Sequence, residues 1–319
     1  MQAIVTLNQQ LVLAEQPKPQ VGPGQLLVKV AAAGVNRADL VQAQGKYPPP
    51  PGESAILGLE IAGEIVAVGA AVEQFQIGDR VFGLVAGGAY AEYCLLDQHL
   101  CWLQPDTLSS EAAASLPEAW LTAWLNLIEL GQLKAGQRVL IHAGASGVGA
   151  AAIQLAKSRG AWVAVTTSSS EKQEFCRALG ADLVIDYRQQ DFATEVKAAG
   201  GADLILDTIG ASYLAGNQRC LNLDGTMIVI GLLGGLEATL NLGVLLMKRQ
   251  RVLGSTLRSL PLARKAELAR AVAQYVLPSL VNGEFKVTLD RSFPLAQAQE
   301  AHEYLAQNRN LGKVVLFCQ

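Results

Sequence analysis

Histidine, cysteine and charged residues are scarce in this sequence of 319 residues, and each shortage excludes a class of protein. The 3 His residues lie far apart and none of the 5 Cys residues forms a C-x-x-C pair, which argues against a zinc site and a disulfide framework. Charged residues make up 17% and give a formal net charge of −3 without a run of Lys or Arg, so we expect no nucleic-acid partner. The longest apolar runs, such as 242–247, are too short to cross a bilayer, and we expect no membrane association. Because no basic leader precedes an apolar segment, we expect a cytoplasmic protein.

Hydrophobic residues and glycine are abundant, at 50% of the chain and 31 residues. This composition excludes a disordered or fibrous chain, and the length predicts about two domains at roughly 150 residues each. The first 120 residues read as short strands, for example 25–31 and 61–68, separated by turns rich in Gly and Pro. This part of the chain is therefore expected to be β-rich.

After residue 109 the pattern changes to alternating helices and strands. Residues 111–130 predict a helix with a break at Pro117. Repeated β-α units then predict a parallel sheet covered by helices on both faces. The predicted strands are 138–142, 162–166, 183–186, 204–207 and 226–230, and the first two predicted helices are 148–159 and 171–179. The last 60 residues predict a helix at 262–280, a strand at 285–289, a helix at 295–308 and a strand at 314–317, a tail that can return to the first domain.

A glycine-rich loop gives the strongest local signal for a ligand. It connects a predicted strand to a predicted helix, the context in which free backbone N–H groups and the helix dipole bind a pyrophosphate. The middle glycine of the usual G-x-G-x-x-G pattern is replaced by serine, with another glycine directly after it. A strand–helix turn without a ligand is the alternative interpretation. The loop residues expected at the pyrophosphate are Gly144, Ser146, Gly147 and Val148.

The end of the second predicted strand indicates which dinucleotide is bound. A site for NAD places an acidic residue there to bind the ribose 2′-hydroxyl, whereas this chain continues with Ser168 and, shortly after, Lys172. Hydroxyl groups and a lysine can bind and neutralise a 2′-phosphate, so we predict NADPH rather than NADH. An ordinary helix N-cap at 168–170 with a solvated lysine is compatible with the same sequence.

An ordered set of motifs resembles the zinc-free quinone oxidoreductases of the medium-chain dehydrogenase/reductase superfamily, including the zeta-crystallin-like and tumour-suppressor-induced types. The resemblance extends over nearly the whole chain. The motifs are GVNRADL at 34–40, GLEIAG at 58–63, GDRVFG at 78–83, PEAWLTAW at 117–124, IHAGASGVG at 141–149 and NLGKVV at 310–315.

The resemblance implies an α/β fold with two domains. A GroES-like, β-rich catalytic domain would comprise residues 1–120 and 259–319, and a Rossmann domain with a doubly wound parallel sheet would bind NADPH within residues 121–258. It also implies a cofactor cleft between the domains and a homodimer formed through the Rossmann sheet.

Two replacements indicate the chemistry. Asn36 and Leu59 stand where the zinc alcohol dehydrogenases of this superfamily carry Cys and His, and neither can replace a thiolate or an imidazole as a zinc ligand. We therefore expect no metal, and hydride transfer from NADPH to an already activated acceptor, a quinone. Reduction of an enone or enal needs only the same cleft. A non-catalytic NADPH-binding role, as relatives of zeta-crystallin have in lens and on RNA, is a further alternative.

The resemblance also implies roles for individual residues. Asn36 and Tyr47 are expected to line the nicotinamide and substrate cleft, although Tyr47 alone could simply pack on the Pro run 48–51. His142 and Cys176 are expected to be packed residues without a catalytic role. Thr122 is expected near the nicotinamide or, equally, to bond back to its own helix. The remaining cofactor contacts implied are Lys172 and Tyr187 at the 2′-phosphate, Gly231, Leu232 and Leu233 at the carboxamide, and Gly312 and Lys313 in a closing segment.

Overall fold

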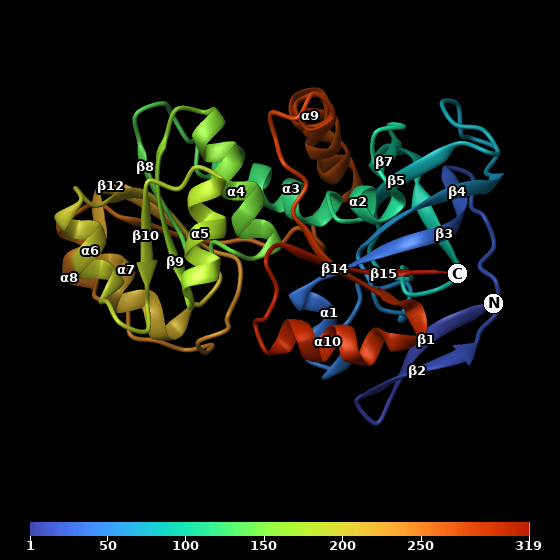
Figure 1. The fold of residues 1–319 in the computed structure, drawn as a ribbon, viewed down its shortest axis with the longest axis horizontal. Helices are drawn as coiled ribbons and strands as arrows, with labels where there is room; N and C mark the ends of the chain where they lie inside the picture. The colour runs from blue at the N-terminus through green and yellow to red at the C-terminus, as the bar shows by residue number, and fades with distance from the viewer. Residues whose placement is uncertain (319) are drawn as a thin grey trace. The chain divides into compact units, whose positions relative to one another are not determined.

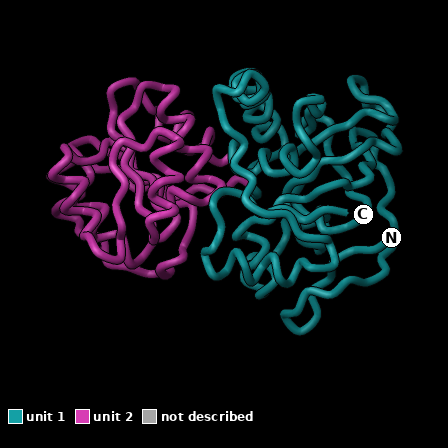
Figure 2. Tube along the Cα trace, in the orientation of Figure 1, with its two compact units in different colours: residues 1–121, 258–319 teal, residues 122–257 magenta. Residues whose placement is uncertain are grey.

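The structure is a computed structural model that describes residues 1–318, and its chain forms two compact units. Unit 1 consists of Met1–Leu121 together with Arg258–Gln319, and unit 2 consists of Thr122–Leu257 (Figure 2). Unit 1 is thus built from two segments that are distant in sequence, whereas unit 2 is one continuous segment.

Unit 1 contains a seven-stranded sheet and a separate hairpin (Figure 1). Its strand order is β14-β15-β3-β4-β5-β7, and β6 also pairs with β3. All of its pairs are antiparallel except β14 with β15. The strands are β1 (Gln2–Leu7), β2 (Gln10–Glu15), β3 (Gln25–Val35), β4 (Glu60–Val68), β5 (Arg80–Leu84), β6 (Tyr93–Asp97), β7 (Cys101–Leu103), β14 (Leu289–Pro294) and β15 (Lys313–Phe317).

The helices predicted for unit 1 are present, α1 is an additional helix that was not predicted, and one predicted strand is wrong. Pro117 occupies the first position of α3, where a missing N–H is tolerated, so the predicted break separates α2 from α3. The strand predicted at 285–289 is wrong, because β14 begins only at Leu289. Phe285 instead belongs to the turn after α9, where its ring stacks on Trp120 with centroids 4.9 Å apart. The helices are α1 (Arg37–Ala43), α2 (Ser110–Ala114), α3 (Pro117–Trp124), α9 (Leu262–Val281) and α10 (Ala298–Ala306).

Unit 2 is a six-stranded, all-parallel sheet in the order β10-β9-β8-β11-β12-β13. The chain order reverses between β8 and β11, and ligands bind at such switch points, outside the carboxyl ends of the strands. The predicted α/β fold with a Rossmann sheet is confirmed.

The strands of unit 2 are β8 (Arg138–Ile141), β9 (Trp162–Thr167), β10 (Leu183–Asp186), β11 (Ala202–Asp207), β12 (Leu221–Val229) and β13 (Arg251–Gly254). The helices are α4 (Gly147–Ser158), α5 (Ser170–Ala178), α6 (Phe192–Ala198), α7 (Leu214–Cys220) and α8 (Leu242–Met247), and residues Leu125–Leu130 form a π-helix.

The core of unit 2 lies on its central strands. Leu140, Ala164, Ile205 and Met227 come from four neighbouring strands and are fully buried. Strands covered on both faces have continuous apolar runs rather than alternating ones, which explains why their sequences lack a two-residue period.

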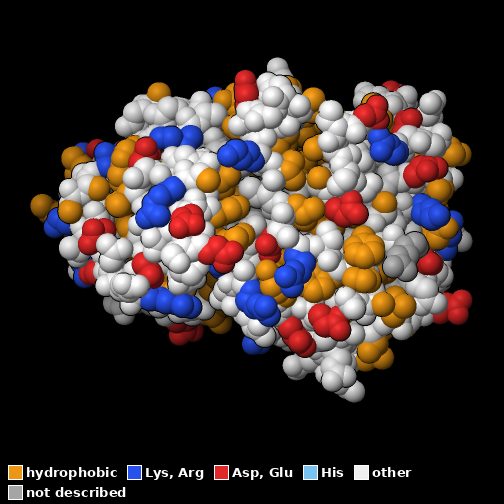
Figure 3. All heavy atoms as spheres, in the orientation of Figure 1, with side chains coloured by type: hydrophobic (Ala, Val, Ile, Leu, Met, Phe, Trp, Pro, Cys, Tyr) orange, Lys and Arg blue, Asp and Glu red, His pale blue; other side chains and the backbone are white. Residues whose placement is uncertain are grey.

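The surface carries charges of both signs. On the face shown in Figure 3, Lys and Arg side chains are scattered among Asp and Glu side chains and form no continuous basic area. Within residues 1–318, no helix combines the length and the apolar character that a membrane span requires.

Candidate active site

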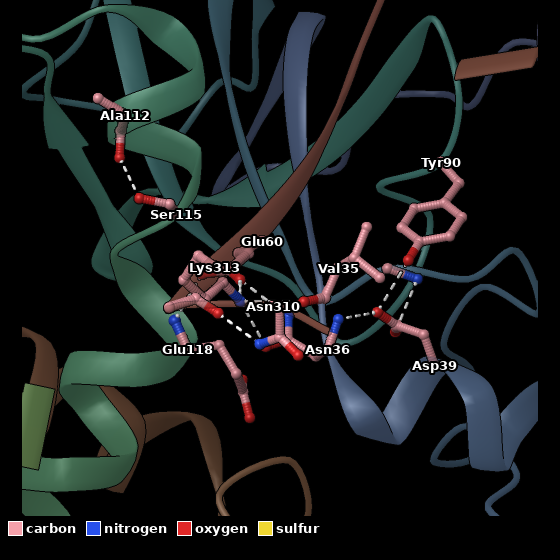
Figure 4. Close-up of polar contacts among 12 residues, drawn as sticks. Val35, Asn36, Asp39, Glu60, Tyr90, Ala112, Ser115, Glu118, Asn310 and Lys313 are labelled. Atoms are coloured by element: carbon pink, nitrogen blue, oxygen red, sulfur yellow. Dashed lines mark hydrogen bonds and ion pairs between the residues drawn. The ribbon is translucent and has the colours of Figure 1, made fainter. Parts of the chain in front are cut away.

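A buried lysine and a buried glutamate form the centre of the polar cluster in unit 1. Lys313, at the start of β15, and Glu60, at the start of β4, form an ion pair in which their side chains are 5% and 0% exposed. The Lys313 ammonium group also donates to Asn36 Oδ1 at 2.6 Å and to the Val35 carbonyl at 3.3 Å (Figure 4). An ammonium group has three donors, so all three are used within this unit.

Glu60 connects this pair to two further segments. Its carboxylate accepts hydrogen bonds from Asn36 Nδ2 at 2.8 Å and from the Glu118 backbone N–H at 2.9 Å. Gly34 makes this arrangement possible, because a Cβ atom at that position would overlap the Glu60 carboxylate. Since the side-chain amide of Asn36 accepts from Lys313 and donates to Glu60, its orientation is fixed, and only one of its two N–H donors is used among the described residues.

A second buried carboxylate holds the loop around Asn36. Asp39, in the first turn of α1, accepts from the backbone N–H groups of Asn36 at 2.7 Å and Gly58 at 3.2 Å, and from the Tyr90 hydroxyl at 3.0 Å. The Tyr90 oxygen lies 3.1 Å from His302 Nε2. Burial raises the pKa of Asp39 to about 6 and lowers that of His302 to about 4. This chain of hydrogen bonds ties α1 to α10.

Tyr47 lies beside a buried arginine. The guanidinium group of Arg258 is 5.3 Å from the centre of the Tyr47 ring, and it donates to the Ala86 carbonyl at 2.9 and 2.6 Å. The pKa of Tyr47 is raised by burial and by the nearby Glu118 carboxyl, and Arg258 offsets part of the shift. The Tyr47 hydroxyl therefore stays protonated and able to donate a hydrogen bond.

Zinc does not fit this cluster. A lysine ammonium group already occupies the oxygen atoms of Asn36 and Glu60, and a second cation would be repelled there. Leu59 is apolar and 1% exposed. In the described part of the chain, no three His, Cys, Asp or Glu side chains come together as a candidate metal-binding group.

In unit 2, the glycine-rich loop lies at the carboxyl end of β8, next to the switch point. Ser146 is the N-cap of α4, and its hydroxyl accepts from the Gly149 N–H at 3.0 Å. A Cβ atom on Gly149 would lie 2.5 Å from the Ala143 carbonyl oxygen, so this position requires glycine. Gly147 and Val148 form the first turn of α4. Their N–H groups have no helical acceptor, the property that a pyrophosphate site needs.

The residues predicted at the 2′-phosphate follow β9 and β10. Ser169, not Ser168, is the N-cap of α5, and it accepts from the Lys172 backbone N–H at 3.4 Å. Ser168 is half-buried, and Tyr187, after β10, is 41% exposed. The Thr167 hydroxyl, at the end of β9, is buried without a hydrogen-bond partner among the described residues, so it can still form a hydrogen bond.

The other residues predicted to contact the cofactor lie in separate segments of the two units. Thr122, in α3, accepts from Asn126 Nδ2 through its backbone carbonyl at 2.8 Å. The loop after β12 begins near Gly231, and Leu232 and Leu233 in this loop are 50% and 52% exposed. Gly312 is buried directly before Lys313, and its carbonyl accepts from Asn310 at 2.7 Å.

His142 and Cys176 are packed residues. His142 Nε2 lies 2.8 Å from the Asn217 side-chain oxygen, its Nδ1 lies 3.1 Å from the Thr166 hydroxyl, and its ring is fully buried. Burial lowers the pKa of His142 and raises that of the Cys176 thiol to about 12. Neither group is prepared for acid–base or nucleophilic chemistry.

Sequence reasoning missed several residues of the unit 1 cluster. Asp39, Tyr90, Glu118 and His302 come from four segments, and only the structure brings them together. The one local signal was Asp39, which stands three residues after Asn36 and so has the spacing of a capping box.

Two family models match the chain. An alcohol dehydrogenase GroES-like domain matches residues 22–106, and a zinc-binding dehydrogenase domain matches residues 147–274. Among curated proteins, a mycocerosic acid synthase-like polyketide synthase of Mycobacterium tuberculosis is 32% identical over 92% of this chain, which spans 14% of that much longer protein. The synaptic vesicle membrane protein VAT-1 homolog of Rattus norvegicus is 31% identical over 93% of this chain and 78% of its own length.

Solved structures match over almost the entire chain. A mycobacterial protein complexed with NADPH is 32% identical, with a TM-score of 0.90 over 99% of both chains. The Escherichia coli quinone oxidoreductase complexed with NADPH is 27% identical, with a TM-score of 0.89 over 99% of this chain and 98% of its own. The CurK enoyl reductase is 28% identical, with a TM-score of 0.87 over 100% of this chain and 99% of its own. By fold, by the order of its motifs and by these similarities, the chain belongs to the medium-chain dehydrogenase/reductase superfamily.

Proposed function

We propose that this protein is an NADPH-dependent quinone reductase that works without zinc. The observation that carries the proposal is the Lys313 ammonium group bound to Asn36 and Glu60, because the resemblance puts Asn36 at the position of a zinc ligand. Alcohol oxidation needs a Lewis acid or a base to stabilise an alkoxide. A quinone needs neither, because its reduced oxygen shares the negative charge with a conjugated ring.

The chain's own residues would bind and orient the two reactants. The first turn of α4, at Ser146, Gly147 and Val148, would bind the pyrophosphate of NADPH through backbone N–H groups. Ser168 and Lys172 would bind the 2′-phosphate, since no acidic residue stands at the tip of β9 to repel it. When bound, NADPH supplies the hydride.

Asn36 and Tyr47 would orient the acceptor. The unused N–H of Asn36 and the protonated Tyr47 hydroxyl are both hydrogen-bond donors suited to a quinone oxygen. Lys313 would act indirectly, by fixing the side-chain amide of Asn36. The mycobacterial protein and the E. coli quinone oxidoreductase were both solved in complex with NADPH, which supports the choice of cofactor.

Steady-state kinetics test this proposal. NADPH and NADH should be compared with ortho-quinones, para-quinones and enones as acceptors, and a primary alcohol with NADP⁺ serves as the control for zinc-type chemistry. We expect quinone reduction with a higher kcat/KM for NADPH than for NADH, and no alcohol oxidation. Equal or better efficiency with NADH would contradict the cofactor assignment, and absence of NADPH consumption with every acceptor would contradict the reaction.

Reduction of an enone or enal is the second candidate. It is favoured by the similarity to the CurK enoyl reductase and to polyketide synthases. The same acceptor panel separates the two, because a kcat/KM for enones far above that for quinones would reverse the assignment.

We also propose that the protein forms a homodimer through unit 2. Strand β13 is the last strand of its sheet, and α8 next to it in the chain carries Leu242, Leu246 and Met247 at 68%, 75% and 77% exposed. Large apolar side chains on neighbouring surface positions are typical of an interface.

A further inference from the structure

Glu118 places a carboxyl group beside the buried ion pair without taking part in it. Its backbone N–H donates to Glu60 at 2.9 Å and holds the first turn of α3 there, while its side chain extends away from Glu60 and Lys313 (Figure 4). The side chain is neither fully buried nor exposed. Among residues 1–318, no group donates a hydrogen bond to its carboxyl oxygens. This carboxyl group is therefore available to a ligand.

The surroundings of Glu118 favour its protonated form. Burial raises the pKa of Glu118 to about 8, and the nearby negative charge of Glu60 adds to the shift. The positive charges of Lys313 and Arg258 lower the pKa of Glu118, whereas the negative charge of Asp39 raises it, as Glu60 does. At neutral pH the group is thus mostly an undissociated acid, with an O–H bond that can donate a proton.

Glu118 also lies near both residues proposed to orient the acceptor. Its charge influences the pKa of Tyr47, and Glu60 hydrogen-bonds to both Glu118 and Asn36. The other candidate acids are less suitable. Asp39 and Glu60 are fully buried and each accepts three or more hydrogen bonds within unit 1, and the raised pKa of Tyr47 makes it a weaker acid than Glu118.

We propose that Glu118 is the general acid that protonates the reduced acceptor, a role that rests on the proposed reductase function. The hydride comes from bound NADPH, which would lose a C–H bond and be oxidised to NADP⁺; it forms a C–H bond on a conjugated acceptor and moves an electron pair onto the acceptor oxygen. The O–H bond of Glu118 breaks, the proton forms an O–H bond on that oxygen, and the Glu118 carboxylate recovers a proton from water. An acid whose pKa lies close to the working pH is the most effective donor.

The first test measures the protonation of Glu118 in the cofactor-free protein. Infrared difference spectra of protein carrying ¹³C-labelled glutamate would be recorded from pH 5 to pH 10 for the wild type and for Glu118→Gln. We expect a protonated-carboxyl band that is lost near pH 8 and is missing in Glu118→Gln. Loss of that band near the ordinary value of 4.5 would overturn the proposal.

The second test measures catalysis with acceptors that differ in their need for a proton. One is an enone, whose enolate product is strongly basic, and the other is a quinone with electron-withdrawing substituents, whose reduced anion is stable at neutral pH. For Glu118→Gln we expect kcat on the enone to fall about 100-fold or more, the scale of general-acid catalysis, and kcat on the substituted quinone to fall far less. The wild-type kcat on the enone should decline above pH 8, and this decline should vanish in Glu118→Gln.

Two further variants complete the design. Glu111→Gln removes an acidic residue from the first turn of α2 and should leave both rates unchanged. Glu118→Asp keeps an acid on a shorter side chain and should recover part of the enone rate. NADPH affinity, measured by fluorescence, should be the same in all variants.

Each remaining outcome counts against one of the two proposals. If Glu118→Gln lowers kcat equally on both acceptors, or if its kcat on the enone still declines above pH 8, Glu118 has a structural role. Either result would overturn the general-acid proposal alone. If the wild type consumes NADPH with neither acceptor, the reductase function fails and the acid role fails with it, while the infrared measurement still reports the protonation of Glu118.

Discussion

The buried pair of Lys313 and Glu60 leads to a quantitative prediction about stability. Lys313→Met leaves the Glu60 carboxylate fully buried with two neutral donors, and Glu60→Gln leaves the ammonium group without a counter-charge. Removal of one partner of a buried pair costs about 3–5 kcal/mol, because the other charge remains desolvated. We expect each single substitution to lower the free energy of unfolding by this amount.

The double variant Glu60→Gln/Lys313→Met removes both charges and keeps two side chains of similar volume. The double variant should lose less free energy of unfolding than the two single variants together. The difference should be at least about 1.5 kcal/mol, the coupling energy expected of groups in direct contact. Urea unfolding at pH 7, followed by circular dichroism, measures all three variants. Because the pair is buried, the coupling should change little between low and high salt.

The pair formed by Arg249 and Asp224 is the matched control. Its side chains are 61% and 62% exposed, so the same double-mutant cycle should give a much smaller coupling energy than the buried pair, and salt should weaken it. Strictly additive losses for Lys313 and Glu60 would refute the reasoning that these charges depend on each other.

Three shorter predictions follow from other features. Glu118 has a folded-state pKa of about 8, above its ordinary value of 4.5, so the wild type should lose stability relative to Glu118→Gln as the pH rises from 4.5 to 8. Urea unfolding across this pH range should show that the free energy of unfolding falls by about 2 kcal/mol. This loss is smaller than the full value of about 1.4 kcal/mol per pKa unit because the carboxyl is partly exposed. Lys172→Ala should raise the KM for NADPH about tenfold and leave the KM for NADH unchanged, since only NADPH carries the phosphate that this lysine is proposed to bind; an equal rise for both cofactors would contradict that role. Leu246→Glu should convert a dimer into a monomer in sedimentation velocity, and an unchanged sedimentation coefficient would place any interface elsewhere.

The sequence was sufficient for the fold class because its signals are local and repeated. Alternating strands and helices of ordinary length lead to a parallel sheet, and the loop around Ser146 identifies the first strand of that sheet. Pro117 marked a helix boundary because it lacks an N–H group. The strand predicted at 285–289 failed because Phe285 is apolar for a different reason, its packing on Trp120.

The candidate site was less accessible to sequence reasoning. Asn36 could be selected because it stands in a motif, but nothing near it in the sequence indicates that its amide is held by Lys313, 277 residues later. Glu118 reads as an ordinary acidic residue in the first turn of a helix, where negative charge is common. Its raised pKa depends on burial and on Glu60, which only the tertiary structure places beside it.

The position of β15 within the unit 1 sheet also affects how the protein is made. Lys313 lies 253 positions after its partner Glu60 in the sequence, and β15 inserts between β14 and β3. During synthesis the continuous unit 2 can fold early, whereas the sheet of unit 1 must wait for this strand, and until then Glu60 has no cation to neutralise it. The nascent chain therefore carries an incomplete, negatively charged site, and the proposed reductase activity should be gained only in the last step of folding.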